Sequence, residues 1–432
     1  MYNLNMQSKL KPLKIIIWCY FLLLIFEGAL RKWVMPGLAT PLLLVRDPLA
    51  ILLMYKTTQV GISWVNNYVR IAWFATALSF ALSLTLLGHQ NILVAIFGAR
   101  IMIFHFPLIF IIGKVFDKED VLKMGRVLML ICIPMTLLVA LQFYSPQSAL
   151  VNRGIGGNLA GSGFTGAMGY FRPSGLFSFT SGNVQFYSLC ACFIFYFALS
   201  KDKCPKWLLI GSSISLVFAM PLSISRTLLF SALLTGIFAV VASFRFPKMG
   251  YGIIKASLVV LLLLGVLQTV STFRIATEVM TDRFNAAGKS EGGTLEGTIG
   301  DRFLGSFIGP VSAIVKEPIL SGKLGMGTNA GAKMMGSTSF LISETEWGRL
   351  TGERGILLGL LTIALRVILI VFLTFKAWTF VKRGQILPWF ILSFAFFAVV
   401  QGQWAQPSSL GFAILSAGLV AASMKPKINL QP

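Results

Sequence analysis

The segment MPLSISRTLLF, Met220–Phe230, places a single arginine between two apolar stretches. The stretches on either side of this junction, at about 207–222 and 226–244, approach or reach the roughly 17–25 apolar residues that a helix needs to cross a bilayer. Hardly any polar residues separate them. The segment therefore indicates two membrane helices joined by a short turn, with Arg226 at the membrane boundary.

The composition of the whole chain agrees with this interpretation. Of its 432 residues, 56% are hydrophobic and 12% are charged, and the mean hydropathy is +0.79, whereas soluble domains contain roughly 45–50% apolar residues. These values exclude an ordinary soluble protein. Because an unpaired sheet edge is not tolerated in hydrocarbon, the predicted fold class is all-α, a polytopic integral membrane protein.

We expect a single transmembrane domain, 1–432, with about twelve transmembrane helices. One large extracytoplasmic loop, 273–351, precedes the tenth span. The second and seventh spans have the weakest patterns, because Arg46-Asp47-Pro48 interrupts one and the other is short. The expected spans are 13–30, 38–55, 69–88, 91–113, 124–145, 176–199, 207–222, 226–244, 252–272, 352–375, 386–402 and 408–424.

Lysine and arginine concentrate on alternate connections. With a cytoplasmic N-terminus, the inside segments hold 20 of the 37 Lys and Arg residues, as the preference of basic residues for the cytoplasmic side predicts. Both termini are then expected to be cytoplasmic. The first apolar run is expected to be a span rather than a cleavable signal, because Glu27-Gly28 interrupts it and no small-residue cleavage site follows. The short outside loops hold only Arg31, Lys32, Arg46, Arg153, Arg172 and Arg226.

The net charge of +22 follows from this asymmetry and from attraction to anionic lipid. The lipid bilayer is therefore the expected partner, and nucleic acid is not. Arg172 and Arg226 lie on the expected outer side, against the general bias. Two interpretations stay open: arginines that reach out to lipid phosphates, or an anion-binding site.

Motifs for nucleotide or metal chemistry are absent from the sequence. It has no GxxxxGK[ST] loop, no HExxH and no Cys/His cluster, and its histidines, His89 and His105, stand alone. We therefore expect no metal and no cofactor. The glycines of SGKLGMGTNAG, 321–331, are a weak candidate for a phosphate-binding turn. We expect His105 to be a packing residue rather than a proton carrier.

Five charged side chains fall within expected spans, where an unpaired charge costs a few kcal/mol. We expect them to pair with one another or to line a wet cavity. Pairing of Arg46 or Arg31 with Glu27 or Asp47 would hold the first helices together. The five are Glu27, Arg46, Asp47, Arg100 and Arg366.

The large loop contains or adjoins nine of the fifteen acidic residues. An amphipathic helix is expected at its start, STFRIATEVMTDRF (271–284). A Gly/Ser/Glu-rich stretch, 286–301, follows, and then a second helical pattern, 301–318. With little polar chain elsewhere, this loop is where chemistry on the outer face is expected.

The segment SFLISETEWGRLTGERGILLGLL, 339–361, is unlike the rest of the chain. At helical spacing, Glu346, Arg349 and Glu353 share one face. One interpretation is a solvated ladder of ion pairs at the membrane boundary. The other is a site for a sugar on a lipid phosphate, in which arginines bind phosphate, a carboxylate takes a hydroxyl proton and Trp347 stacks on the sugar ring.

These features resemble the O-antigen ligase and polymerase superfamily of bacterial envelope enzymes, which are membrane glycosyltransferases of the C type. The resemblance rests on Arg172-Pro-Ser-Gly-Leu-Phe, on Ser225-Arg226-Thr227, and on a glycine-rich turn at 318–327 followed by Glu353-Arg-Gly-Ile-Leu-Leu-Gly. Together with the expected spans and late outer loop, it covers nearly the whole chain. The run EGALRKWVMPGLATPLLLVRDP, 27–48, is similar to that of exopolysaccharide polymerases.

The resemblance implies a polysaccharide polymerase of the bacterial inner membrane. Its donor would be a glycan on polyprenyl pyrophosphate, its acceptor a sugar hydroxyl, and its partners a chain-length regulator and a flippase. No metal or cofactor takes part. The implied roles are pyrophosphate binding for Arg172, Arg226 and Arg349, general base for Glu344 or Glu346, and support for Trp347, Glu353 and Arg302.

The sequence departs from the family pattern at one point, and two other functions are also compatible with it. Ligases of the family carry a histidine late in the large loop, but here no histidine follows His105, so a polymerase is favoured over a ligase. A transporter would also use about twelve spans, and it should show two related halves and discontinuous helices. A noncatalytic component of an envelope assembly is the third interpretation.

Overall fold

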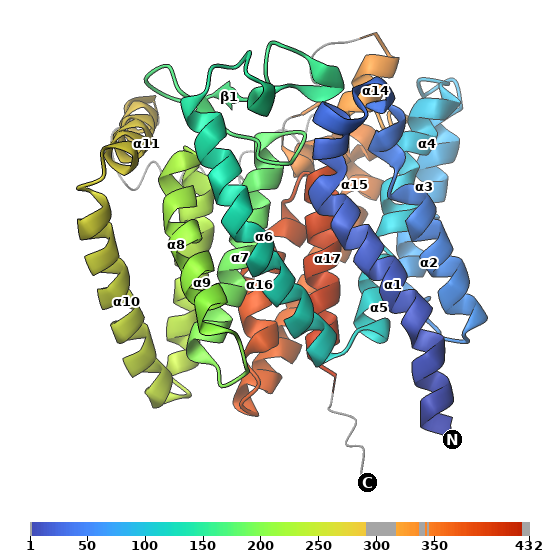
Figure 1. Cartoon of the computed structure of the whole chain (residues 1–432). Coiled ribbons are helices and arrows are strands. Elements are labelled where there is room, and N and C mark those ends of the chain that lie inside the picture. The colour runs from blue at the N-terminus through green and yellow to red at the C-terminus, as the bar shows by residue number, and fades with distance from the viewer. Residues whose placement is uncertain (1, 291–316, 337–341, 344, 426–432) are drawn as a thin grey trace.

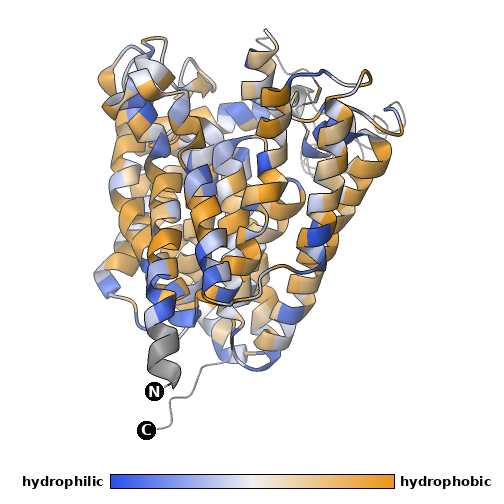
Figure 2. Cartoon of the chain, turned by 90° about the vertical axis from the view of Figure 1, so that its right-hand side faces the viewer, coloured by the Kyte–Doolittle hydropathy of each residue, from blue (hydrophilic) through white to orange (hydrophobic). Residues whose placement is uncertain are grey.

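The chain forms a bundle of helices packed side by side (Figure 1). This computed structural model describes residues 2–290, 317–336, 342–343 and 345–425. Roughly 75% of it is helical, and the described residues include one short antiparallel hairpin, so the all-α prediction is confirmed. Hydrophobic residues run along the length of the helices (Figure 2), as expected for elements that face lipid or one another.

Fifteen α-helices and two strands define the described fold. They are α1 (Tyr2–Ala29), α2 (Asp47–Gln59), α3 (Asn67–Ser83), α4 (Ile92–Arg100), α5 (Leu108–Val115), α6 (Lys118–Tyr144), β1 (Phe164–Thr165), β2 (Phe171–Arg172), α7 (Thr180–Leu199), α8 (Lys206–Leu222), α9 (Arg226–Ser243), α10 (Pro247–Leu267), α11 (Ser271–Ser290), α14 (Asn329–Met334), α15 (Glu346–Lys382), α16 (Leu387–Val400) and α17 (Pro407–Ser423).

Seven helices in the described ranges are long and apolar enough to cross a membrane. They are Ser8–Val34, Ile92–Val115, Lys118–Tyr144, Thr180–Leu199, Arg226–Ser243, Pro247–Leu267 and Glu346–Lys382. Three shorter apolar helices, α8, α16 and α17, join them. Each of the twelve expected spans overlaps a helix, but the count of twelve crossings stays a prediction.

The expected second span is wrong as a single helix. Residues 36–38 and 41–44 form separate 3₁₀ turns, and α2 begins only at Asp47 with Pro48 in its first turn. Proline suits that position because its missing N–H needs no partner there. The 13 residues of α2 extend about 20 Å at 1.5 Å per residue, less than the roughly 30 Å of hydrocarbon.

Local sequence explains where the helices around Arg226 begin and end. Ser225 lies at the N-cap of α9, where its side chain accepts a hydrogen bond from the backbone N–H of Leu228 at 3.4 Å. Such a cap satisfies one of the donors that a helix leaves open at its start. Arg226 therefore occupies the first position of α9, as the opening segment indicates.

The core of the bundle is formed by α5, α7, α16 and α17, which are buried on nearly all faces. By contrast, α10 is almost entirely exposed, with only Met249 and Leu267 buried. The beginning of α1 and the end of α17 lie at one end of the bundle, and the β1–β2 hairpin, α11 and α14 lie at the other (Figure 1). We call these the terminal end and the loop end.

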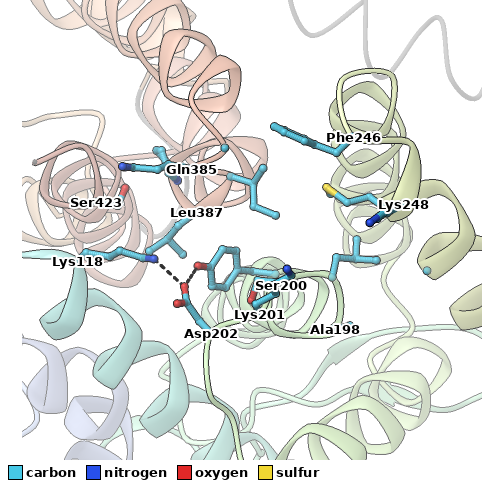
Figure 3. Close-up of a pocket in the computed structure, with 17 residues that line it drawn as sticks. Lys118, Ala198, Ser200, Lys201, Asp202, Phe246, Lys248, Gln385, Leu387 and Ser423 are labelled. Carbon is cyan, nitrogen blue, oxygen red and sulfur yellow. Dashed lines mark hydrogen bonds and ion pairs between the residues drawn. The ribbon is translucent and has the colours of Figure 1, made fainter. Parts of the chain in front are cut away.

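A cavity of about 550 Å³ opens between α7, α10 and α16. It lies at the terminal end, because it is lined by the last residues of α7 and α17 and the first of α10 and α16 (Figure 3).

The helix α15 is a hairpin rather than one continuous rod. Gly355 has φ of +80° and ψ of 173°, outside the helical region. In an unbroken helix, residues twenty positions apart are about 30 Å apart, yet Arg366 Nη1 lies 2.6 Å from Glu346 Oε1. The chain therefore folds back at Gly355, and 346–354 lies against the long arm 356–382. The predicted span 352–375 is corrected accordingly.

Replacement of Gly355 tests this hairpin. A Cβ there meets the Leu320 Cα at 2.6 Å and stands on a residue with positive φ, so Gly355→Ala should destabilise the fold by about 2 kcal/mol or more. Gly384→Ala is the matched control, because its φ is +83° but nothing lies within 4 Å. Thermal unfolding of the detergent-solubilised protein should show the larger loss for Gly355→Ala; equal losses would contradict the close contact.

Candidate functional site

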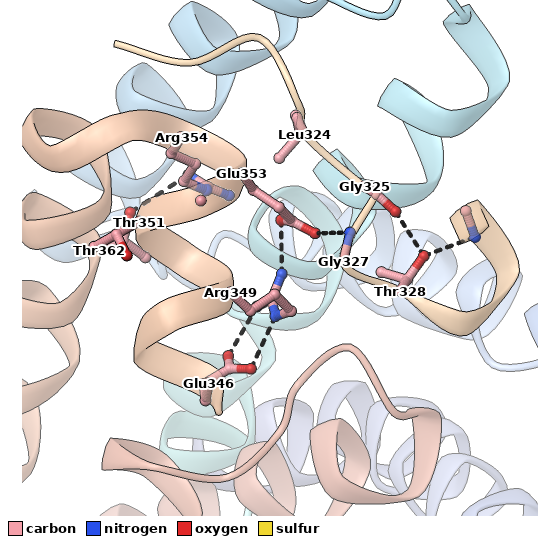
Figure 4. A network of polar contacts seen from close by, with 12 residues as sticks. Leu324, Gly325, Gly327, Thr328, Glu346, Arg349, Thr351, Glu353, Arg354 and Thr362 are labelled. Atoms are coloured by element: carbon pink, nitrogen blue, oxygen red, sulfur yellow. Dashed lines mark hydrogen bonds and ion pairs between the residues drawn. The ribbon is translucent and has the colours of Figure 1, made fainter. Parts of the chain in front are cut away.

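The short arm of α15 carries a buried network of charges at the loop end (Figure 4). Arg349 donates from Nε and Nη2 to Glu346, at 2.9 and 2.8 Å, and from Nη1 to Glu353 at 2.7 Å. The three side chains share one helix face, as their spacing predicts. All three are at least 95% buried, so a solvated ladder is not what forms.

The long arm of α15 contributes Arg366 to the same network. Its Nη1 donates to Glu346, while Nε donates to the Val399 carbonyl at 2.7 Å and Nη2 to the Gly402 carbonyl at 3.1 Å. The guanidinium lies over the ring of Trp404, 3.7 Å from its centroid. Two arginines and two glutamates are thus joined by direct hydrogen bonds, which makes their burial tolerable. Arg354 on the same arm is also buried, but it donates to the hydroxyls of Thr76 and Thr362.

Trp347 belongs to the same arm. Its indole N–H donates to the Val400 carbonyl at 3.0 Å, and its ring packs against the core. This contact ties the short arm of α15 to the end of α16.

A small cavity adjoins the network. Its lining comes from three segments and consists of Gly327, Asn329, Ser343, Thr345, Glu346, Arg349, Gln403, Ala405 and Gln406. Its volume of about 10 Å³ is close to that of one water molecule. The predicted base Glu344 and the predicted supporting residue Arg302 lie outside the described residues, although the neighbours of Glu344 line this cavity.

The glycine-rich turn packs against helices rather than presenting free N–H groups to a phosphate. Gly325, with φ of +91°, sits so close to α4 that a Cβ would meet the Val94 carbonyl at 2.1 Å. The N–H of Gly327 donates to Glu353 at 2.9 Å, and that of Leu324 to the Ser83 hydroxyl at 3.2 Å. Close backbone packing therefore explains these glycines.

His89, the first of the two histidines of the chain, holds this turn. The Asn91 N–H donates to His89 Nδ1 at 3.0 Å, so Nε2 carries the proton and donates to the Leu324 carbonyl at 3.1 Å. His105 is likewise satisfied, by Tyr20 at 3.0 Å and Asp47 at 2.8 Å. Both histidines thus have structural partners.

A second cationic group surrounds the start of α9. Burial and the nearby positive charge of Arg226 lower the pKa of Arg283 on α11. Arg283 Nη1 donates to the Gly166 carbonyl at 2.9 Å, and Gly166 follows β1 in the hairpin that also contains Arg172. The hairpin, α9 and α11 therefore meet around two neighbouring guanidiniums. Arg172 itself lies 6.0 Å from the centroid of Phe164.

The segment Gln403–Pro407 contacts both the small cavity of the α15 network and the start of α7. Gln406 lines the cavity beside Glu346 and Arg349, and its Oε1 accepts a hydrogen bond from Ser181 at 2.7 Å. Ser181 lies in the first turn of α7, directly after the Arg172-Pro-Ser-Gly-Leu-Phe run. The Gln403–Pro407 segment thus connects the hairpin side of the loop end with the α15 side.

The run 172–178 is held by the EGALRKW segment. Lys32 is fully buried and its ammonium donates to the Ser174 hydroxyl at 3.0 Å and to the carbonyls of Gly175 and Phe177 at 2.8 and 2.9 Å. Arg31 donates to the Ser178 hydroxyl at 3.0 Å. Two segments that the resemblance singles out, far apart in the chain, are therefore in direct contact.

The buried charges of the first helices form pairs, as expected. Glu27 accepts from Arg31 at 3.4 Å and from Arg46 at 3.3 Å, while both carboxylate oxygens of Asp47 accept from Nη1 of Arg100, at 2.8 and 3.0 Å. The predicted pairing of the N-terminal charges is confirmed for Glu27. Asp47 takes a different partner because α2 packs against the helical turn that follows α4.

Sequence reasoning missed Arg283, Lys32 and Arg366 as members of the loop-end groups. The only sequence signal for Arg366 was a cation within an apolar run. The only signal for Arg283 was its position in the expected amphipathic helix. Among the described residues, no group of three or more His, Cys, Asp and Glu is placed to hold a metal. Comparisons with models of known protein families, with curated proteins and with solved structures found no match to the chain.

Replacement of Arg366 alone should lower the stability of the fold more than replacement of both partners of its ion pair with Glu346. Arg366→Met leaves Glu346 buried with one fewer cation and should destabilise the fold by about 3–5 kcal/mol. The double variant Glu346→Leu, Arg366→Met removes one charge of each sign and should recover part of that loss. Thermal unfolding in detergent measures both; a double variant worse than the single one would refute the charge-balance argument.

Lys32 should be needed to hold the 172–178 run. Lys32→Met leaves three buried acceptors without this donor, and we expect a loss of about 2 kcal/mol, since hydrogen bonds to charged groups contribute roughly 1.5–3 kcal/mol. Lys56→Met makes the same change at an exposed position and should be neutral. The thermal unfolding midpoint is the measurement, and equal midpoints for the two variants would contradict the role of Lys32.

Proposed function

We propose that the protein is a membrane glycosyltransferase that joins glycan repeat units carried on polyprenyl pyrophosphate at the outer face of the bacterial inner membrane. The observation that carries this proposal is the pair of guanidiniums of Arg226 and Arg283 at the loop end. The rings of Phe230 on α9 and Phe284 on α11 pack with 6.3 Å between their centroids, so the helices that carry Arg226 and Arg283 are in contact. Two neighbouring cations stabilise a multiply charged anion such as a pyrophosphate. Both termini are then cytoplasmic and the loop end faces outward.

The reaction uses these cations on the leaving group. The acceptor hydroxyl gives its proton to a carboxylate, and its oxygen attacks the anomeric carbon of the donor sugar. The bond between that carbon and the pyrophosphate oxygen breaks, and negative charge develops on the departing lipid pyrophosphate. Arg226 and Arg283, with Arg172 on the adjoining hairpin, stabilise that charge.

The carboxylates divide into two roles. Both oxygens of Glu346 accept hydrogen bonds from arginines, which makes its carboxylate a weak base. Glu353 is similarly engaged by Arg349 and Gly327. We therefore assign both glutamates to positioning Arg349 beside the small cavity, and Glu344 remains the proposed general base.

A transporter of lipid-linked glycans is the second candidate. Two observations favour it: α15 reverses at Gly355, and the 92–115 helix is interrupted by a π-helical turn at 101–105 before Pro107. Discontinuous helices often mark binding sites in transporters. An O-antigen ligase remains a third candidate by resemblance, and the absence of a histidine after His105 argues against it.

Complementation of a strain lacking the protein distinguishes these functions. Arg226→Ala, Arg172→Ala, Arg283→Ala and Glu344→Gln should each reduce long surface polymer by about 10²-fold in rate, as removal of one charge-stabilising donor does. Lipid-linked single units should be retained on the outer leaflet. Arg274→Ala is the control, because Arg274 lies exposed on the same helix as Arg283 and pairs only loosely with Glu278, at 3.9 Å.

Gels of surface polysaccharide, with membrane abundance measured alongside, give the result. Accumulation of single units on the inner leaflet would favour the transporter. Full polymer with no transfer to a lipid acceptor would favour the ligase. Unchanged polymer in all four variants would sink the proposed mechanism and leave Arg226 as an interfacial anchor.

A further inference from the structure

The cavity of about 550 Å³ at the terminal end lies away from the proposed glycan site. It is bordered by the α7–α8 connection, the first turn of α10, the α15–α16 connection and the end of α17. Phe246 and Lys248 lie across it from Lys118 and Gln385 (Figure 3). Its size is in the range of roughly 300–1,000 Å³ that small-molecule sites occupy.

The lining of this cavity is cationic. It contains three lysines, Lys118, Lys201 and Lys248, and one acid, Asp202, for a net charge of +2. Lys118 pairs with Asp202 at 2.8 Å, and the Tyr196 hydroxyl donates to the same carboxylate. These contacts hold Asp202 at one wall, and the ammonium groups of Lys201 and Lys248 are exposed.

Apolar side chains form the remainder of the lining. Leu199, Phe246, Met249, Ile386 and Leu387 contribute to it. Further along the side of α10 that carries Met249 and Gly252, apolar side chains are exposed, among them Val259 at 64% and Val260 at 40%. The cationic cavity therefore adjoins an apolar surface of α10, which runs from the terminal end toward the loop end (Figure 1).

We propose that this cavity binds the phosphate headgroup of an anionic membrane phospholipid, whose acyl chains lie along α10. The charge complementarity and the continuity with the exposed α10 surface select such a lipid over a free metabolite, which would use only the cationic half. Basic residues near a membrane surface each strengthen binding of anionic lipid. This inference is independent of the glycosyltransferase proposal, because none of its residues belongs to the loop end.

Native mass spectrometry of the full-length protein in detergent, titrated with phosphatidylglycerol, tests the proposal. Loss of two lysines in Lys201→Gln, Lys248→Gln should weaken the tightest binding event by about tenfold or more, since each basic residue contributes about 1 kcal/mol. The matched control Lys382→Gln, Arg383→Gln removes the same charge from exposed positions near that end, outside the lining, and should leave binding unchanged. Phosphatidylcholine should bind weakly to every variant.

The opposing outcomes are distinct. Equal weakening by both double variants would overturn the site in favour of diffuse surface attraction. Equal binding of phosphatidylcholine and phosphatidylglycerol to the unaltered protein would overturn the role of lipid charge. Displacement of the lipid by millimolar inorganic phosphate would show that a free phosphate is the ligand. The thermal unfolding midpoints of the two double variants are the control, because equal midpoints exclude unfolding as the cause of weaker lipid binding.

Discussion

The contact between Glu346 and Arg366 is the constraint on which the loop end depends. It joins the two arms of α15 across the reversal at Gly355. Arg366 also donates to the carbonyl of Val399 at the end of α16 and to that of Gly402 in the connection to α17. A charge in this environment is costly unless it is paired and hydrogen-bonded. The pairing therefore fixes the short arm, and with it Arg349, Trp347 and the wall of the small cavity.

The other buried charges of the first helices are also paired or hydrogen-bonded. Glu27 balances Arg31 and Arg46, and Asp47 binds Arg100 and His105. Lys32 instead satisfies its ammonium with backbone carbonyls of the 172–178 run. Lys32 thus holds a loop that lies 142 to 145 residues further along the chain, because a buried cation needs hydrogen-bond acceptors.

The two ends of the bundle differ in what they offer a ligand. At the loop end, the glutamates and arginines of α15 are bonded to one another, whereas Arg283 is bonded to the hairpin on a helix that packs against the start of α9. At the terminal end, lysines surround an open cavity that leads onto the exposed α10. A bundle with cationic sites at both ends is suited to amphiphiles whose phosphate groups lie at a membrane surface.

The sequence by itself determined the helical class, the positions of most helices and the shared face of Glu346, Arg349 and Glu353, because hydropathy and helical periodicity act over neighbouring residues. It did not determine the reversal at Gly355, since Gly348, Gly352 and Gly359 lie close by in the sequence and a glycine is also tolerated inside a straight helix. Nor did it pair Arg366 with Glu346, Lys32 with the 172–178 run or Arg283 with Arg226. These contacts join residues 20 to 145 positions apart, and only the tertiary packing, which must satisfy each buried charge, decides which partners meet.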